Sequence, residues 1–304
     1  MNANIKKKLK GMAKGPLASV LSVLWKVFVK LHLLSLEIRW KREKAPMPTQ
    51  EDQKLMAENA TIIFKSFERH SLAKRLYKNI RKYYPDINII IADDSRKPLK
   101  IDGHNVKVIN LPFNSGLSRG LNAALAQIET PFAIRLDDDE LITPHSGFHR
   151  HLKYLMEHPE VDLVGVTPAS LPLKKDWKAN LEKYNVYSMF NAPKPLIIPH
   201  LTKLDDDHIV LGKVANIFIV RTDKYRALGY DDNIRMIDHH EFFFRAAGNL
   251  VTVLELNSYV IHNHNYFDRK YQKFRTDTKN DHAYINAKHN GAIHQKQMDL
   301  GPKP

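Results

Sequence analysis

The chain has 304 residues, of which 43% are hydrophobic and none is cysteine. This length and content suit one large α/β domain with a buried core, and the lack of cysteine excludes disulfides, thiolate metal ligands and a cysteine nucleophile. The net charge of +14 is unevenly placed, because residues 1–45 hold eleven Lys or Arg against two Glu and so carry +9 of it. The body is therefore ordinary in charge, and no nucleic-acid partner is expected.

Residues 1–45 are predicted to form a basic amphipathic helix on a membrane surface. The stretch Leu17–Trp40 is rich in Leu, Val, Phe and Trp, but Lys26 and Lys30 interrupt it and no small-residue cleavage site follows. A secretory signal is therefore not expected, and each central Lys would cost a membrane-spanning helix about 2.5–3.5 kcal/mol. Lysines along one stripe and large apolar side chains over the rest suit an anionic headgroup layer. The alternative is a helix docked on the chain's own body or on a second subunit.

Beyond this arm the pattern changes to alternating strands and helices. Two prolines within Ala45–Pro48 are expected to end the first helix, and residues 46–58 are predicted to be a linker. From residue 59 onward short apolar runs alternate with helical periodicity, which indicates a mostly parallel sheet with helices on both faces. The predicted strands cover 61–64, 87–92, 106–109 and 131–136, and the predicted helices cover 71–84 and 117–128.

Carboxylates directly follow two of these strands. The triplet Asp137–Asp139 ends one apolar run, and the pair Asp93 and Asp94 ends another. Open α/β sheets bind ligands at the carboxyl ends of their strands, and clustered carboxylates there suit Mg²⁺ or Mn²⁺. An acidic loop or a helix N-cap is the alternative for one isolated triplet. A second triplet, 205–207, follows no predicted strand and is expected to be a solvated loop.

Short motifs follow one another along the chain at Thr61–Arg69, Ala92–Ser95, Asn114–Asn122, Leu136–Asp139, Asn216–Phe218, Val220–Lys224, Gly229–Asp231, His239–Phe243 and Val260–His264. The first four resemble the nucleotide-sugar half of GT-A glycosyltransferases of the family-2 type. The later ones are similar to the β-1,4-N-acetylgalactosaminyltransferases that build gangliosides. The usual glycine after Asp94 is missing here, and so is the Gln-x-x-Arg-Trp signature of synthases that extrude polymers.

The resemblance implies an α/β GT-A fold over residues 59–265. Residues 59–140 would form the nucleotide-sugar half, and 141–265 the acceptor and catalytic half. The proline-rich segment 166–210 is interpreted as a variable insertion that faces the acceptor. The tail 266–304 is expected to be either a lid over the diphosphate or a solvated basic helix.

The metal assignment follows from the chemistry of the leaving group. Negative charge grows on a nucleoside diphosphate as its bond to the sugar breaks, and a divalent cation held by carboxylates stabilises that charge. By resemblance, Asp137 and Asp139 would hold Mn²⁺ or Mg²⁺, and His264 would be a further ligand. His262 competes with His264 for this role.

The donor nucleotide is expected at the same strand ends. Either Asp93 or Asp94 would accept a hydrogen bond from the uracil N3–H, and Arg119 is placed to meet the base or a phosphate. A Gly-containing turn that opens a helix allows close backbone approach to such a ligand. The predicted nucleotide-sugar ligands are Asp93, Asp94, Asn114, Gly116, Arg119, Asp137 and Asp138.

Glu241 is predicted to be the catalytic base. An inverting transferase needs a carboxylate that takes the proton of the acceptor hydroxyl, and the phenylalanines after Glu241 would raise its pKa. The alternative is a glutamate in the first turn of a helix that Asp238 caps. His239 and His240 are expected to contact the acceptor or the surroundings of the metal.

The sequence thus predicts a metal-dependent inverting glycosyltransferase. It would move a hexose or N-acetylhexosamine from a UDP-sugar to a glycan or glycolipid acceptor. Its expected location is the cytoplasmic face of a bacterial membrane, bound there through residues 1–45 during surface polysaccharide synthesis. The alternatives are a nucleotidyltransferase and a non-enzymatic membrane-docking protein with a transferase-like body.

Overall fold

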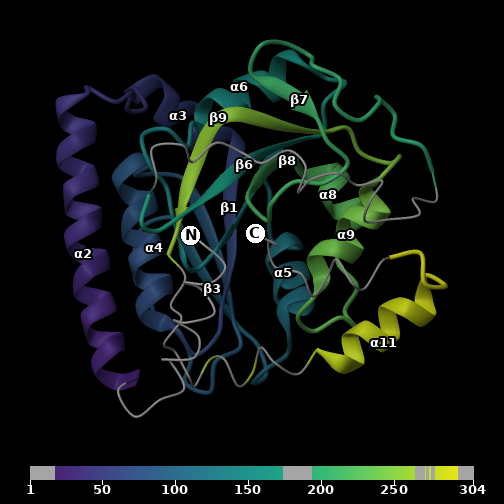
Figure 1. Cartoon of the computed structure of the whole chain (residues 1–304), viewed down its shortest axis with the longest axis horizontal. Coiled ribbons are helices and arrows are strands. Elements are labelled where there is room, and N and C mark those ends of the chain that lie inside the picture. The colour runs from purple at the N-terminus through teal and green to yellow at the C-terminus, as the bar shows by residue number, and fades with distance from the viewer. Residues whose placement is uncertain (1–17, 174–193, 264–270, 272–273, 275–277, 294–304) are drawn as a thin grey trace.

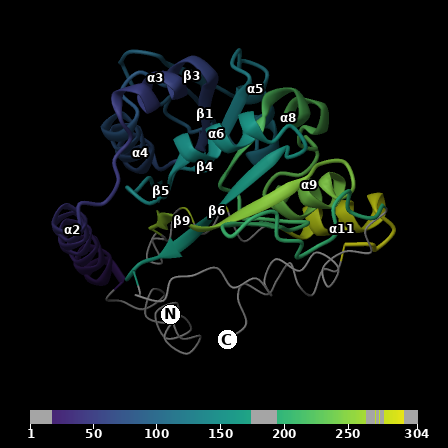
Figure 2. The same ribbon diagram turned by 90° about the horizontal axis from the view of Figure 1, so that it is seen from above.

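The computed structural model describes residues 18–173, 194–263, 271, 274 and 278–293. Nine strands of this described part form one curled sheet, with helices packed on both faces (Figures 1 and 2). The strand order is β3-β2-β1-β4-β8-β6-β9-β5, and β7 pairs with β9. The sheet is therefore continuous from the half expected to bind the nucleotide to the half expected to hold the acceptor.

The first half of the sheet is parallel, as the alternating pattern predicts. Each strand alternates buried side chains between the two faces: Ile62 and Phe64 join one core, and Ile63 joins the other. The elements are β1 (Ala60–Ser66), α4 (His70–Tyr83), β2 (Asn88–Asp93), β3 (Val106–Asn110), α5 (Leu117–Leu125) and β4 (Phe132–Asp137).

The second half mixes directions, so the sheet is less uniformly parallel than the sequence suggests. β8 (Phe218–Arg221) runs antiparallel to both β4 and β6 (Leu163–Ser170), whereas β6 and β9 (Thr252–His262) are parallel. The short strands β5 (Glu140–Leu141) and β7 (His208–Val210) add antiparallel edges to β9. Among the described residues after β5, the helices are α6 (Phe148–Glu157), α8 (Thr222–Leu228), α9 (Asp238–Ala246) and α11 (Lys279–Lys288).

The expected linker 46–58 is wrong over most of its length, because α3 (Gln50–Asn59) occupies it. A capping box starts this helix: Thr49 Oγ1 accepts from the Asp52 backbone N–H at 3.1 Å, and Asp52 Oδ2 accepts from the Thr49 N–H at 2.9 Å. Lys153 of α6 also donates to Asp52 at 2.6 Å. The Thr49-x-x-Asp52 spacing was visible in the sequence and could have predicted the helix.

The basic arm forms α2 (Ala18–Arg42), which lies along one side of the molecule (Figures 1 and 2). Val29, Leu36 and Trp40 are buried against side chains of β5, β6 and β9. The helix is therefore docked on the chain's own body, the alternative that the sequence left open. It also presents a second apolar face, with exposed fractions between 41% and 61%, made of Val20, Val23, Leu24, Val27, Phe28, Leu31, Leu34 and Ile38. In the described part of the chain, no helix meets the length and apolarity required to cross a bilayer.

Candidate active site

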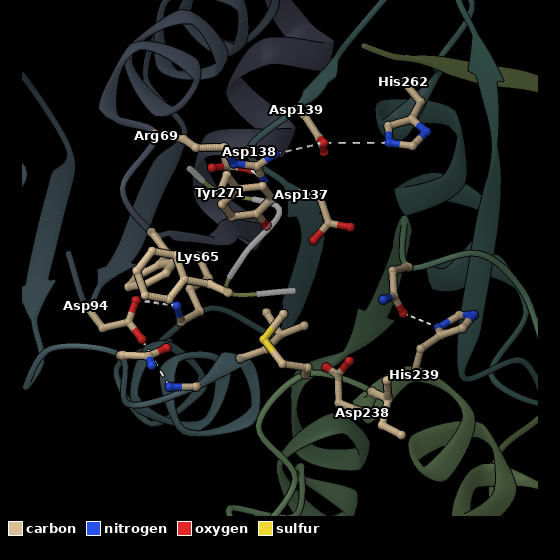
Figure 3. A pocket seen from close by; sticks show the side chains of 18 of the residues that line it. Lys65, Arg69, Asp94, Asp137, Asp138, Asp139, Asp238, His239, His262 and Tyr271 are labelled. Carbon is tan, nitrogen blue, oxygen red and sulfur yellow. Dashed lines mark hydrogen bonds and ion pairs between the residues drawn. The ribbon is translucent and has the colours of Figure 1, made fainter. Parts of the chain in front are cut away.

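A cavity of about 400 Å³ opens where the carboxyl ends of β1, β2 and β4 approach the start of α9 (Figure 3). The topology explains its position, because parallel strands end at one edge of the sheet and leave a crevice there. Its described lining is Lys65, Phe67, Arg69, Asp94, Asn114, Gly116, Leu117, Asp137, Asp138, Asp139, Asn216, Met236, Ile237, Asp238, His239, His240, His262, Tyr271 and Phe274.

The three consecutive aspartates line the cavity and are held by two arginines. The fully buried Arg135 forms an ion pair with Asp137 at 2.8 Å, while the Asp137 side chain remains 39% exposed. Arg69 donates to Asp139 Oδ2 at 3.2 Å and also pairs with Asp138. Burial raises the pKa of Asp138 to about 7, although the positive charge of Arg69 opposes the shift.

The donor set fits a divalent cation that also binds substrate phosphates. His262 Nε2 lies 3.7 Å from Asp139 Oδ2. Figure 3 shows the imidazole of His262 facing Asp139, with the Asp137 side chain nearby. Among the described residues no three acidic, His or Cys side chains are already gathered around one metal position. Mg²⁺ and Mn²⁺ sites of this type use one or two carboxylates and take further oxygens from the substrate. Asp137, Asp139 and His262 could hold such an ion, whereas the predicted ligand His264 lies outside the described residues.

The structure separates the two adjacent candidates for base recognition. Asp93, the last residue of β2, is buried and accepts hydrogen bonds from Ser95 Oγ at 2.6 Å and the Leu99 N–H at 2.8 Å. Asp94 instead lines the cavity, pairs with Lys65 and accepts the Gly116 N–H at 3.0 Å. Asp94 is therefore the carboxylate of this pair that a bound nucleotide would meet.

The turn before α5 supplies two further predicted residues. Asn114 and Gly116 both line the cavity, and Gly116 has φ +103°, so an added Cβ would lie only 2.8 Å from Arg235 Cγ. Glycine is thus required at this position by both backbone and space. Arg119 is not brought to the site: it is exposed, and its Nε donates to the Asp232 carbonyl at 3.2 Å.

Asp238, the first residue of α9, is the carboxylate that the helix presents to the cavity. Asp238 is 2% exposed, and its Oδ2 atom has no hydrogen-bond partner. Burial raises the pKa of Asp238 to about 7, against the opposing charge of Arg135. Figure 3 shows Asp137 and Asp238 directed into the same space from opposite sides. A buried carboxylate with this pKa and one oxygen free of hydrogen bonds is suited to accept a proton from a bound hydroxyl.

Glu241, the base predicted from the sequence, is not part of the described cavity lining. It is 1% exposed and accepts hydrogen bonds from Arg245 Nε and Lys288 Nζ, both at 2.8 Å, and contacts His289 Nε2 at 3.1 Å. Burial raises the pKa of Glu241, but Arg245 and Lys288 outweigh it, so the pKa lies below its ordinary value. These contacts are those of a residue that holds α9 and α11 together. The catalytic role of Glu241 stays a prediction.

The two histidines between these carboxylates do reach the cavity. Burial lowers the pKa of His240 to about 3 and that of His239 well below its ordinary value, so both are neutral at pH 7. His239 Nδ1 is hydrogen-bonded to the Asn216 side chain. They can therefore exchange hydrogen bonds with an acceptor but would carry no charge.

Sequence reasoning missed two cations and two aromatic rings of the site. Lys65 and Arg69 flank the end of β1, and this placement next to the acidic strand ends was a usable signal. Tyr271 packs on the Arg69 guanidinium, 3.8 Å from its ring centre, and Phe274 packs edge-on against Phe67. These two side chains bring the C-terminal tail to the cavity wall, which no local pattern predicts. Trp177, Tyr184 and Tyr187 of the expected insertion lie outside the described residues.

Comparisons with known sequences converge on one family. Residues 61–210 match the family model described as Glycosyl transferase family 2. Beta-1,4 N-acetylgalactosaminyltransferase 2 of Mus musculus is 30% identical over 194 residues, which is 63% of this chain and 36% of that protein. Beta-1,4 N-acetylgalactosaminyltransferase 1 of Homo sapiens is 30% identical over 199 residues, with 62% and 36% covered. The chain thus spans about a third of the length of these relatives.

Comparisons with solved structures support the fold. The crystal structure of S. aureus TarS 1-349 superposes with a TM-score of 0.51 at 16% identity, covering 67% of this chain and 60% of that one. Mannosyltransferase PcManGT from Pyrobaculum calidifontis, solved with GDP-Man and Mn²⁺, has a TM-score of 0.50 at 15% identity over 95% of this chain and 78% of its own. The architecture is that of GT-A glycosyltransferases.

Proposed function

Residues 61–210 form a glycosyl transferase family 2 domain, and from this premise we propose that the protein transfers a hexose or N-acetylhexosamine from a UDP-sugar to a glycan or glycolipid acceptor. The observation that carries the proposal is one cavity that Asp94, Asp137, Asp139 and Asp238 all line. This crevice holds side chains that could bind a nucleotide, coordinate a cation and accept a proton. The N-acetylgalactosaminyltransferase names of the sequence relatives support an N-acetylhexosamine donor.

The donor would lie along the ends of β1, β2 and β4. Asp94 is placed to accept from the base, while Lys65 and Arg69 add positive charge beside the diphosphate. Both cations already pair with carboxylates, so a bound diphosphate would share them. A divalent cation at Asp137 and Asp139 would supply the charge that stabilises the departing diphosphate, and PcManGT, which has this fold, was solved with Mn²⁺.

Transfer with inversion needs one proton acceptor on the acceptor side of the sugar. We assign this role to Asp238, because its Oδ2 is buried in the cavity wall without a hydrogen bond. The acceptor oxygen would bond to the sugar C1, its proton would pass to Asp238, and the C1–O bond to UDP would break with its electron pair leaving on UDP. Glu241 remains the alternative derived from the sequence.

The test of this function is release of UDP. Purified protein with Mn²⁺ is expected to bind UDP and to release it from at least one of UDP-GalNAc, UDP-GlcNAc, UDP-galactose and UDP-glucose, with faster release when a glycan acceptor is present. UDP is measured by a coupled assay. Pyrophosphate released from a nucleoside triphosphate and a sugar phosphate would instead support a nucleotidyltransferase.

We also propose that α2 holds the protein on an anionic membrane, at the cytoplasmic face of a bacterial cell that builds a surface polysaccharide. The support is the outward apolar face of α2 together with the positive charge of residues 1–45. Apolar side chains enter the headgroup layer, and lysines add about 1 kcal/mol each near an anionic leaflet. The same helix packs on the body through Val29, Leu36 and Trp40, so deleting it would damage the core.

Point changes on the outward face therefore test the membrane role better than truncation. Leu24→Glu with Leu31→Glu is expected to weaken binding to phosphatidylglycerol vesicles at least tenfold, because burying each leucine contributes about 1.5–3 kcal/mol. Sedimentation with vesicles measures the effect. Ile197→Glu, at a site that is 58% exposed away from α2, is the matched control. Equal sedimentation of both variants and the wild type would exclude α2 as the docking element.

A further inference from the structure

A second cavity, of about 320 Å³, lies between α2 and the start of α4. We call it the α2–α4 groove. Its apolar lining includes Val29 and Leu33 from α2 and Leu72 from α4, and its charged lining is Lys26, Lys30, Glu68, Arg69 and Arg75. The groove thus combines an apolar wall with four cations and one carboxylate, whereas several carboxylates line the first cavity.

Arg75 is the informative member of this cluster. Its Nε and Nη2 atoms are buried but have no hydrogen-bond partner, and none of the ion pairs found among the described residues includes it. Burial lowers the pKa of Arg75, although the charges of Asp139 and Asp138 oppose the shift. A buried guanidinium with unused donors is costly unless an anion accepts from it.

The groove is connected to the candidate active site. Arg69 lines both cavities, and it is the residue that pairs with Asp138 and Asp139. Asn263 also lines the groove, and its backbone N–H donates to the Asp139 carbonyl at 2.9 Å. A molecule seated in the groove could therefore extend past Arg69 towards the sugar-transfer site.

Resting on the glycosyltransferase function proposed above, we propose that the α2–α4 groove binds the phosphate of a membrane lipid that carries the acceptor hydroxyl. Arg75 donates hydrogen bonds to the phosphate, Lys26 and Lys30 surround it at the exposed mouth, and the apolar wall packs against the start of the lipid chain. The outward apolar face lies on another side of the same helix, so a bilayer that receives this face would hold the groove close to its surface. The acceptor class is accordingly a phosphate-linked amphiphile.

The charge and the shape of the groove select this ligand over others. A neutral sugar could accept hydrogen bonds from Arg75 but would bring no negative charge, and a nucleic acid would gain nothing from the apolar contacts of Val29, Leu33 and Leu72. Guanidinium groups bind phosphate through several donors at once, which makes arginine a suitable anchor here.

The experiment compares three soluble probes by tryptophan fluorescence, since Trp25 lines the groove. Octyl phosphate is expected to bind the full chain at least tenfold more tightly than inorganic phosphate or octyl glucoside. Arg75→Gln is expected to weaken octyl phosphate binding about tenfold or more, because charged hydrogen bonds are lost. Lys78→Gln, on the exposed face of the same helix, is the control and should leave binding unchanged.

UDP binding with Mn²⁺ is measured on the same samples. If Arg75→Gln binds UDP as tightly as the wild type but binds octyl phosphate more weakly, the α2–α4 groove is supported as the phosphate site. If the affinities for both ligands fall equally, the proposal is overturned. Octyl phosphate and inorganic phosphate of equal affinity would overturn the lipid ligand, and octyl phosphate affinity unaffected by Arg75→Gln would overturn the assigned residue. Failure of the wild type to bind UDP would overturn the proposed function separately. If Arg75→Gln does not fold, Lys26→Gln with Lys30→Gln at the exposed mouth gives the same comparison.

Discussion

Asp238→Asn is expected to lower kcat by about 10²–10⁴-fold while the protein stays folded. The range is that typical of a lost general base. Asparagine keeps the shape of the side chain but cannot take the proton of the acceptor hydroxyl at neutral pH. Because Asp238 Oδ2 has no hydrogen-bond partner, the substitution breaks no contact there, so the melting temperature should not fall. UDP release with acceptor and thermal unfolding are the two measurements.

Glu241→Gln is the matched comparison, three residues further along α9. The glutamine would weaken the contacts with Arg245 and Lys288, so a loss of about 1–3 kcal/mol in unfolding free energy is expected. Its effect on kcat should be smaller than that of Asp238→Asn. The reverse pattern, with a stable but inactive Glu241→Gln protein and an active Asp238→Asn protein, would return the base to Glu241.

The pH profile gives an independent readout of the same group. The pKa of Asp238 is about 7, raised by burial and by Asp137 against the opposing charge of Arg135. A base works only when deprotonated, so kcat/KM should fall about tenfold per pH unit below 7 and level off above it. Asp238→Asn should flatten this acidic limb. If the acidic limb of the kcat/KM profile is unchanged in Asp238→Asn, a group other than Asp238 causes it.

Removal of divalent cations is expected to have the second large effect, lowering the transfer rate at least about a hundredfold. The physical reason is the charge that develops on the leaving diphosphate, whose stabilisation by a cation is worth several kcal/mol. Treatment with a chelator followed by Mn²⁺ or Mg²⁺ should restore the rate. Asp139→Asn should reproduce the loss and also weaken Mn²⁺ binding, as measured by electron paramagnetic resonance in the presence of UDP.

The second acidic triplet provides the control for this prediction. Asp206 lies in the exposed loop before β7, away from the described lining of the cavity. Asp206→Asn should retain both activity and Mn²⁺ binding. Full activity of the chelated wild-type protein, or equal behaviour of Asp139→Asn and Asp206→Asn, would exclude a metal role for the first triplet.

Local sequence patterns determined most of the first half of the fold. Alternating apolar runs and helical periods predicted β1, β2, β3 and β4 to within one or two residues, because burial on both faces of a parallel sheet imposes those patterns. They also indicated that carboxylates would gather at one sheet edge. Helix α3 was not predicted, because its capping box comes directly after prolines that indicate the start of a linker.

Only the tertiary structure decided which of several neighbouring carboxylates lie at the cavity. Asp93 and Asp94 are adjacent in sequence, yet Ser95 and Leu99 enclose one while Lys65 and Gly116 hold the other at the cavity. The physical reason is the alternation of side chains at a strand end, whose register no short motif reports.

The same distinction applies to the proposed base. The family-like pattern around α9 predicts Glu241 as the base and Asp238 as a helix cap, whereas the structure places Asp238 at the cavity. Lys288, 47 positions beyond Glu241, pairs with it and draws it into the contact with α11. Asp238 is left facing the cavity. Tertiary packing determines which charged residues meet across such a separation in sequence. The choice between Asp238 and Glu241 could therefore not be made from local sequence patterns.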